Sequence, residues 1–238
     1  MTGATVVLPA GRAVAAVDVR GGGPGTRDTE SLDPTCVVDA VDAIVLAGGS
    51  VYGLEAAAGA TVWLAARGRG IAVRGIHVPI VPSAILFDLT HGGDKRWGDM
   101  PPYRRLGQEA CAAAGPDFAL GNAGAGLGAK TATCKGGLGS VSAIDGALGV
   151  TVGALVAVNP SGSVAMPDGT FWAWPFERNG EFGGVRPTGV YADPEPELYD
   201  PDAVPGGNTT IGVVATDHVS QGHALADVAS ASASTPRQ

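Results

Sequence analysis

Residues 51–66 place the strongest constraint on the fold of this chain, because they are apolar nearly all the way round a helix. A surface helix carries one apolar stripe and one polar face, so a helix without a polar face must be covered on several sides. We therefore predict a helix sandwiched between layers. With 45% apolar residues, 16% charged residues and 38 glycines, the 238-residue chain has the composition for a large core with tight turns.

The rest of the pattern indicates a single α/β domain. Short β-rich or apolar runs predict strands at residues 4–8, 13–19, 43–47, 78–88, 149–158 and 210–216, with the first two forming a hairpin. Two further helices are predicted at residues 35–41 and 104–114. Residues 160–207 are rich in Pro, Gly and acidic residues without periodicity, which predicts a long surface excursion before the last strand.

The charge balance and the cysteines exclude several classes of function. Lys and Arg number 15 against 23 Asp and Glu, a net charge of −8 without a basic cluster, so we expect no nucleic-acid partner. Cys36, Cys111 and Cys134 have neither the spacing of a zinc site nor that of a disulfide framework. The N-terminus lacks a signal-peptide pattern, and no apolar run approaches the roughly 20 residues of a bilayer helix. We expect a cytoplasmic protein without a membrane partner.

The Gly-rich run at residues 121–131 superficially resembles a phosphate-binding loop. Such a loop requires Gly immediately before its Lys, whereas Ala129 precedes Lys130, and no strand signal leads into the run. The pattern favours a tight turn that packs backbone against backbone, which is also compatible with a loop beside an active site. We expect no nucleotide binding.

The dipeptide Asn208-Thr209 precedes the last predicted strand and has two interpretations. It is compatible with nothing more than a strand start. Alternatively, a Thr hydroxyl that attacks the preceding carbonyl forms an ester, and hydrolysis of that ester leaves Thr209 with a free α-amine. Such an amine, with a reference pKa of about 7.7–8.0, can act as general base for its own hydroxyl.

Seven segments in order give these residues a family context. They resemble the self-processing N-terminal-nucleophile hydrolases of peptidase family S58, which includes L-aminopeptidase/D-esterases, β-aminopeptidases and 6-aminohexanoate-oligomer (nylon oligomer) hydrolases. The segments are residues 2–7, 17–22, 43–57, 81–88, 121–126, 135–140 and 207–216. The resemblance implies a four-layer αββα sandwich that cuts itself into two chains, here residues 1–208 and 209–238. It implies an amide hydrolase without metal or organic cofactor, acting on aminohexanoate oligomers or on amides of N-terminal amino or β-amino acids, and assembled as a homo-oligomer of at least four copies.

The resemblance also implies roles for individual residues. Thr209 matches the nucleophile and Asn208 the residue on the other side of the cut. Asn159 matches the Asn whose side-chain amide forms the oxyanion hole, although an ordinary turn Asn would have the same sequence context. Tyr52 matches an active-site aromatic residue, with a core aromatic residue as the alternative.

A lysine beside the nucleophile would lower the pKa of its α-amine and help to hold the oxyanion. Lys135, in Lys-Gly-Gly-Leu-Gly, matches this residue best, and Lys130 is the alternative because the preceding loop varies in length among relatives.

The chain departs from the family after the last predicted strand. Relatives continue into an acidic segment that orients the nucleophile's amine, and this pattern is not found after Asp217. Asp217 or Asp227 could take its place, although their spacing does not argue for either. The alternative to an active hydrolase is therefore a catalytically impaired or non-catalytic member of the family.

Overall fold

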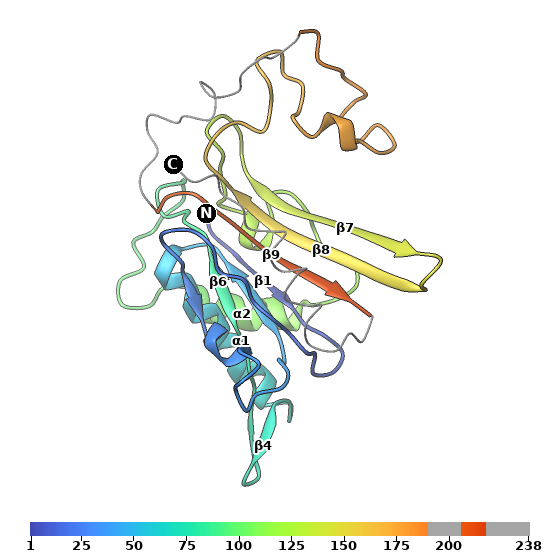
Figure 1. The fold of residues 1–238 in the computed structure, drawn as a ribbon. Coiled ribbons are helices and arrows are strands. Elements are labelled where there is room, and N and C mark those ends of the chain that lie inside the picture. The colour runs from blue at the N-terminus through green and yellow to red at the C-terminus, as the bar shows by residue number, and fades with distance from the viewer. Residues whose placement is uncertain (190–205, 218–238) are drawn as a thin grey trace.

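A computed structural model describes residues 1–189 and 206–217. Its first sheet has four strands in the order β1 (Ala4–Val7), β3 (Ile44–Ala47), β6 (Ser83–Ile85) and β2 (Thr26–Arg27). Strand β3 pairs antiparallel with β1 and parallel with β6, which in turn pairs antiparallel with β2. Figure 1 shows helices α1 (Glu55–Ala65) and α2 (Tyr103–Ala112) packed against this sheet.

The second sheet is antiparallel, with the order β7 (Gly137–Asp145), β8 (Val150–Asn159) and β9 (Thr209–Thr216). It packs against the face of the first sheet that the helices leave open (Figure 1). A small hairpin of β4 (Ile71–Val73) and β5 (Ile76–Val78) projects from the body. The short 3-10 turns are η1 (Thr29–Leu32), η2 (Ser50–Leu54), η3 (Gly124–Gly126) and η4 (Trp174–Phe176).

Strand β3 lies at the centre of the fold because both of its faces are buried. Val45 and Ala47 pack against the two helices, whereas Leu46 points into the core between the sheets. Successive side chains of a strand point to opposite faces, so an unbroken apolar run is what a strand between two layers requires. Leu138, Ala157 and the partly buried Ile211 complete the inner core from the second sheet.

The sequence predicted several of these elements. The predicted helix at 51–66 corresponds to η2 followed by α1, and the helix at 104–114 corresponds to α2. The strands at 43–47, 149–158 and 210–216 correspond to β3, β8 and β9, and the interrupted strand at 78–88 corresponds to the shorter β6. Among the described residues, no helix is both long enough and apolar enough to cross a bilayer.

Two predicted elements were wrong. Residues 13–19 do not form a strand beyond a bridge between Ala13 and Val41, because β1 pairs instead with β3. Residues 35–41 do not form a helix, since a short isolated helix needs a buried face and Val37 is fully exposed. Strand β7 was missed because its sequence, Gly-Leu-Gly-Ser-Val-Ser-Ala-Ile-Asp, is typical of a loop in its first half.

Two glycines allow α1 and α2 to approach closely. A Cβ on Gly59 would lie 2.0 Å from the Arg104 carbonyl oxygen, and a Cβ on Gly107 would lie 2.0 Å from the Ala56 carbonyl oxygen. We expect Gly59→Ala to lower the free energy of unfolding by about 1–3 kcal/mol, although Ala is the better helix former by about 1 kcal/mol. Urea unfolding measures the change. Gly146→Ala, whose Cβ would meet nothing within 4 Å, is the control, and equal losses in both variants would contradict the packing argument.

A buried phenol and a buried thiol predict a loss of stability at high pH. Burial raises the pKa of the Tyr103 phenol to about 12 and that of the Cys111 thiol to about 11, from ordinary values of 10.0 and 9.0. The unfolded chain therefore releases these protons first. The free energy of unfolding should fall as pH rises from about 9 to about 12, by of order 2 kcal/mol for each group. Urea titrations at pH 8 and pH 10.5 measure the fall, which Cys111→Ala should reduce. A profile that Cys111→Ala leaves unchanged would contradict the assignment to this thiol.

Candidate active site

The pairing of β8 with β9 brings two of the predicted site residues together. Asn159 is the last residue of β8 and lies directly opposite Thr209, the first residue of β9. Asn159 lies two residues from Ala157 and Thr209 lies two residues from Ile211, so each shares a face of its strand with a side chain that points into the core between the sheets. Thr209 is half-buried, whereas the preceding Asn208 is exposed. Two residues that are distant in the sequence therefore share one face at one end of the sheet.

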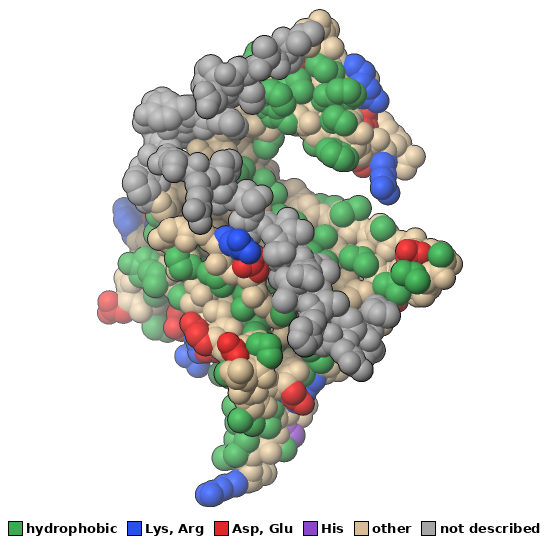
Figure 2. Space-filling view, in the orientation of Figure 1, with side chains coloured by type: hydrophobic (Ala, Val, Ile, Leu, Met, Phe, Trp, Pro, Cys, Tyr) green, Lys and Arg blue, Asp and Glu red, His purple; other side chains and the backbone are tan. Residues whose placement is uncertain are grey.

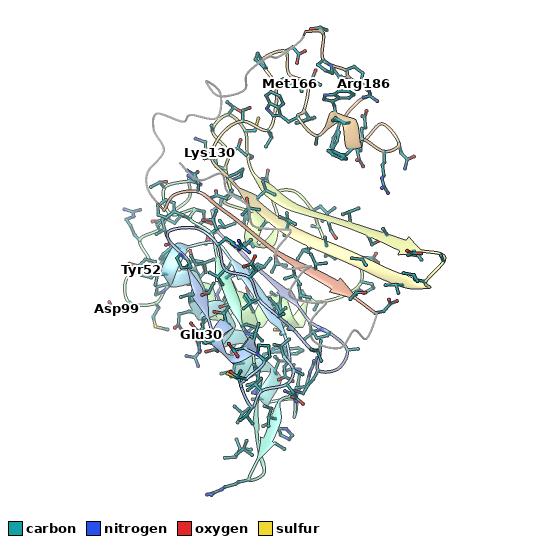
Figure 3. The ribbon with its side chains drawn as sticks, viewed as in Figure 1. Glu30, Tyr52, Asp99, Lys130, Met166 and Arg186 are labelled. Carbon is teal, nitrogen blue, oxygen red and sulfur yellow. The ribbon has the colours of Figure 1, made fainter. Side chains whose placement is uncertain are left out.

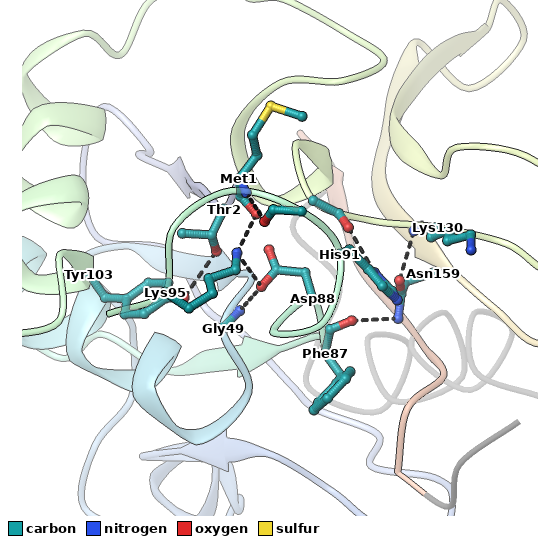
Figure 4. A network of polar contacts seen from close by, with 12 residues as sticks. Met1, Thr2, Gly49, Phe87, Asp88, His91, Lys95, Tyr103, Lys130 and Asn159 are labelled. Atoms are coloured by element: carbon teal, nitrogen blue, oxygen red, sulfur yellow. Dashed lines mark hydrogen bonds and ion pairs between the residues drawn. The ribbon is translucent and has the colours of Figure 1, made fainter. Parts of the chain in front are cut away.

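Asn159 is fully buried and its side-chain amide connects three segments. Its Nδ2 donates to the carbonyl oxygens of Phe87, at 3.1 Å, and Gly207, at 3.0 Å. Its Oδ1 accepts from the backbone N–H of Lys130 at 2.9 Å. Figure 4 shows the contacts to Phe87 and Lys130. An ordinary turn Asn would be exposed, so this residue has the burial and the hydrogen bonds of a fixed polar group.

A cavity of about 240 Å³ opens beside Thr209. Four separate segments of the chain form its wall, which combines apolar side chains with hydroxyl groups. The wall includes Thr209, Thr26, Ser50, Val51, Ile85 and Phe87. Such a mixture can hold an aliphatic group by contact and orient a polar group by hydrogen bonding. Among the described residues, no cluster of three or more His, Cys, Asp or Glu side chains could hold a metal ion.

The two candidate lysines are neighbours. Lys130 and Lys135 are both exposed and face each other in an antiparallel bridge at the base of the loop that joins them. Only Lys130 is hydrogen-bonded to Asn159, through its backbone N–H. Both Lys130 and Tyr52 lie toward the end of the molecule where β9 begins (Figure 3).

Tyr52 lies in η2, the same turn that supplies Ser50 and Val51 to the cavity, but it is not among the residues that line the cavity. Its side chain is 48% exposed, so it is not a core aromatic residue. The ring makes an edge contact with Trp97, with centroids 6.0 Å apart. Its contribution to the site therefore stays a prediction.

Asp88 is a buried polar residue to which the sequence analysis gave no role. It is fully buried, and its Oδ1 accepts from the Gly49 N–H at 2.8 Å and lies 3.9 Å from Lys95 Nζ (Figure 4). Gly49 precedes η2, which forms one wall of the cavity, and Phe87 supplies both a carbonyl to Asn159 and a ring to the cavity. The signal available in the sequence was an acidic residue at the end of an apolar run.

Asp217 does not take the place of the family's acidic segment. Its Oδ1 accepts from the Thr151 N–H at 2.8 Å, beyond the far end of β9 from Thr209. At about 3.3 Å per residue, the two residues lie about 26 Å apart. The extended strand thus excludes a direct contact between this carboxylate and the Thr209 amine. Asp227, the other candidate, lies outside the described residues.

Comparison with solved structures agrees with this architecture. The chain superposes on the L-aminopeptidase D-Ala-esterase/amidase of Ochrobactrum anthropi, described as a variant of the Ntn hydrolase fold, with a TM-score of 0.56 and 20% identity over 96% of this chain and 53% of that one. It superposes on a β-aminopeptidase of Burkholderia with a TM-score of 0.55 and 18% identity, over 95% and 52% of the two chains. The fold is therefore an α/β fold of the Ntn hydrolase class.

The sequence comparisons give the family. The model of peptidase family S58 matches residues 1–235, and the chain belongs to this family. It is 46% identical over 217 residues to a Mycobacterium tuberculosis protein named as an uncharacterized aminopeptidase, covering 90% of this chain and 61% of the relative. It is 34% identical over 227 residues to a 6-aminohexanoate-oligomer endohydrolase of Paenarthrobacter ureafaciens, covering 91% and 58%. The chain thus spans about three fifths of the length of these relatives.

Proposed function

We propose that the protein is an amide-bond hydrolase whose nucleophile is Thr209, set free when the chain cuts itself between Asn208 and Thr209. The observation that carries the proposal is the position of Thr209 at the start of β9, opposite the buried Asn159 and on the wall of a cavity. The substrates would be aminohexanoate oligomers or amides of N-terminal amino or β-amino acids, as the names of the two relatives and of the β-aminopeptidase structure suggest.

The cutting reaction would follow the chemistry of an N-to-O acyl shift. Thr209 Oγ attacks the Asn208 carbonyl carbon, the peptide C–N bond breaks, and the hydroxyl proton passes to the nitrogen, which becomes the α-amine. Water then hydrolyses the ester, which leaves a carboxylate on Asn208 and restores the hydroxyl. The two products would be a segment of residues 1–208 and a segment beginning at residue 209.

Turnover would use the same atoms. The α-amine accepts the proton of Thr209 Oγ as that oxygen attacks the amide carbonyl of the substrate, and then delivers the proton to the leaving amine. The acyl group remains as an ester on Thr209 until water removes it. An Asn159 Nδ2–H aimed at the developing oxyanion would lower the barrier by roughly 3–4 kcal/mol.

The positive charge that lowers the pKa of the α-amine would be the ammonium group of Lys130 or of Lys135, which pair through their backbones. The hydrogen bond from the Lys130 N–H to Asn159 supports Lys130, whereas the Lys-Gly-Gly-Leu-Gly motif supports Lys135. Tyr52 would act from the turn η2, whose Ser50 and Val51 line the cavity.

Assigning this role to Lys130, whose backbone N–H holds Asn159, predicts a difference between two matched variants. We expect Lys130→Gln to lower kcat/KM by about tenfold or more and to move the acid limb of its pH profile upward, because removing a nearby positive charge raises the pKa of the amine. Lys135→Gln should leave the position of this limb unchanged. The opposite result, with only Lys135→Gln moving the limb, would transfer the role to Lys135.

The four-layer sandwich and the homo-oligomer also remain proposals. The face of the second sheet turned away from the core is apolar, with Val150, Val152, Ala154 and Val156 on β8, and apolar side chains follow the β7–β8 hairpin in Figure 2. Val141 on this face is 63% exposed. An apolar face on an antiparallel sheet supports a covering layer or a partner copy. Light scattering after gel filtration would measure the number of copies.

The experiment that tests the function is mass spectrometry of the purified protein followed by a hydrolysis assay on the same sample. We expect two fragments that meet between Asn208 and Thr209, together with hydrolysis of an aminohexanoyl or β-alanyl anilide. Cut protein without hydrolysis would support the alternative, a catalytically impaired member of the family. The separation of about 26 Å between Asp217 and Thr209, estimated from the length of β9, favours this alternative.

A further inference from the structure

The side-chain amide of Asn159 has no N–H left for a substrate in the uncut chain. Its Nδ2 carries two hydrogens, and the carbonyl oxygens of Phe87 and Gly207 accept one each, at 3.1 and 3.0 Å. The side chain is fully buried, and its Oδ1 is held by the Lys130 N–H. An amide held at both ends cannot turn to offer a third hydrogen bond. For Asn159 to bind an oxyanion, one of the two carbonyls must leave.

The two carbonyls differ in what the proposed cut does to them. Phe87 follows β6 and lies far in sequence from the cut, so its position does not depend on the Asn208–Thr209 bond. Gly207 lies on the N-terminal side of that bond, one residue before Asn208. Once the bond is broken, β9 no longer holds Gly207 in place. The Phe87 carbonyl keeps the side chain oriented, while the hydrogen bond to Gly207 can be exchanged.

The exchangeable hydrogen bond lies close to the proposed nucleophile, Thr209. Asn159 and Thr209 are opposite each other in the β8–β9 register and share the face directed into the core. Side chains directly opposite in an antiparallel pair lie about 4.5–5.5 Å apart at Cβ. An oxygen that accepts from Asn159 Nδ2 at the position of the Gly207 oxygen is therefore a near neighbour of Thr209.

We infer that the Gly207 carbonyl occupies the oxyanion-binding position of the uncut chain, and that the carbonyl oxygen of an amide substrate replaces it after the cut. This inference rests on the proposed function. The exchange breaks and forms hydrogen bonds only: Nδ2–H···O=C of Gly207 gives way to Nδ2–H···O=C of the substrate. The ligand class is a linear amide with an unhindered carbonyl. The uncut chain thus lacks both the general base and the free oxyanion donor.

Side-chain amide NMR tests this exchange directly, because the chain has only four asparagines, at positions 122, 159, 179 and 208. The Asn159 signals are the pair that disappears in Asn159→Asp. If that variant does not fold, Asn122→Asp, Asn179→Asp and Asn208→Asp assign the remaining pair by elimination. The samples compared are uncut Thr209→Ala and cut wild-type protein, both containing all 238 residues and labelled at Nδ2 of asparagine.

In the uncut variant, both Asn159 hydrogens should be protected from exchange with solvent. In the cut protein, one should stay protected by the Phe87 carbonyl, and the other should exchange about tenfold faster, which corresponds to the loss of one hydrogen bond. Asn122, whose Nδ2 donates to the Gly136 carbonyl at 3.1 Å away from the cut, is the internal control and should not change.

The possible outcomes separate this inference from the function on which it rests. Wild-type protein whose mass remains that of a single chain contradicts the proposed function and removes the basis for the exchange. Cut protein in which both Asn159 hydrogens remain protected contradicts the exchange alone. Faster exchange of one hydrogen in the cut protein, with Asn122 unchanged, supports the inference.

Discussion

Thr209→Ala is expected to remain a single chain of 238 residues and to lose amide hydrolysis by roughly 10⁴-fold or more, because the variant has neither the hydroxyl that cuts the chain nor the nucleophile for turnover. Thr209→Ser keeps the hydroxyl and should still be cut. Mass spectrometry and a hydrolysis assay on an aminohexanoyl anilide measure both effects.

The neighbouring threonine offers a matched control. Thr210 follows in β9, is exposed, and has the opposite orientation to Thr209 in the strand. Thr210→Ala should be cut and should turn over substrate like the wild type. If Thr209→Ala were cut normally, or if both variants lost activity equally, Thr209 would not be the nucleophile.

Asn159→Asp is expected to have the second largest effect, on activity and stability together. The substitution keeps the shape of the side chain but removes both donors, so a carboxylate would face the Phe87 and Gly207 carbonyls in a buried site. We expect amide hydrolysis by the cut protein to slow by about 10²-fold or more, as for the loss of an oxyanion donor. The free energy of unfolding should fall by about 2–4 kcal/mol, because buried polar groups lose their partners. A hydrolysis assay on the cut protein and urea unfolding measure the two effects.

The control for this variant is Asn122→Asp. Asn122 also donates from Nδ2 to a backbone carbonyl, that of Gly136, but it is exposed. Its replacement should leave the rate of amide hydrolysis unchanged and lower the free energy of unfolding by less than about 1 kcal/mol. Asn159→Ser, which is neutral, serves as a second variant if Asn159→Asp does not fold. Normal amide hydrolysis by either folded and cut Asn159 variant would contradict the proposed role of this amide.

The helices and strands that were predicted correctly are those whose own residues are enough to specify them. The helix at α1 follows from an apolar, Ala-rich run, and strands β3 and β8 follow from unbroken apolar runs that only a position between layers can satisfy. The elements that were missed have causes elsewhere in the chain. Residues 13–19 do not form the predicted hairpin, because β1 pairs with β3 instead. Strand β7 forms because β8 pairs with this Gly- and Ser-rich segment.

The sequence by itself determined the family, the core strands and the Asn208–Thr209 dipeptide, because ordered motifs and local patterns are properties of the linear chain. Only the tertiary structure decided what Asn159 touches, since its partners Phe87 and Gly207 lie 72 and 48 residues away. It likewise made Asp88 the buried partner of Gly49 and placed Asp217 at the far end of β9. Hydrogen bonds between distant segments depend on how the sheets pack and on strand register. Sheet packing and register both depend on several segments together, so no single segment of the chain predicts them.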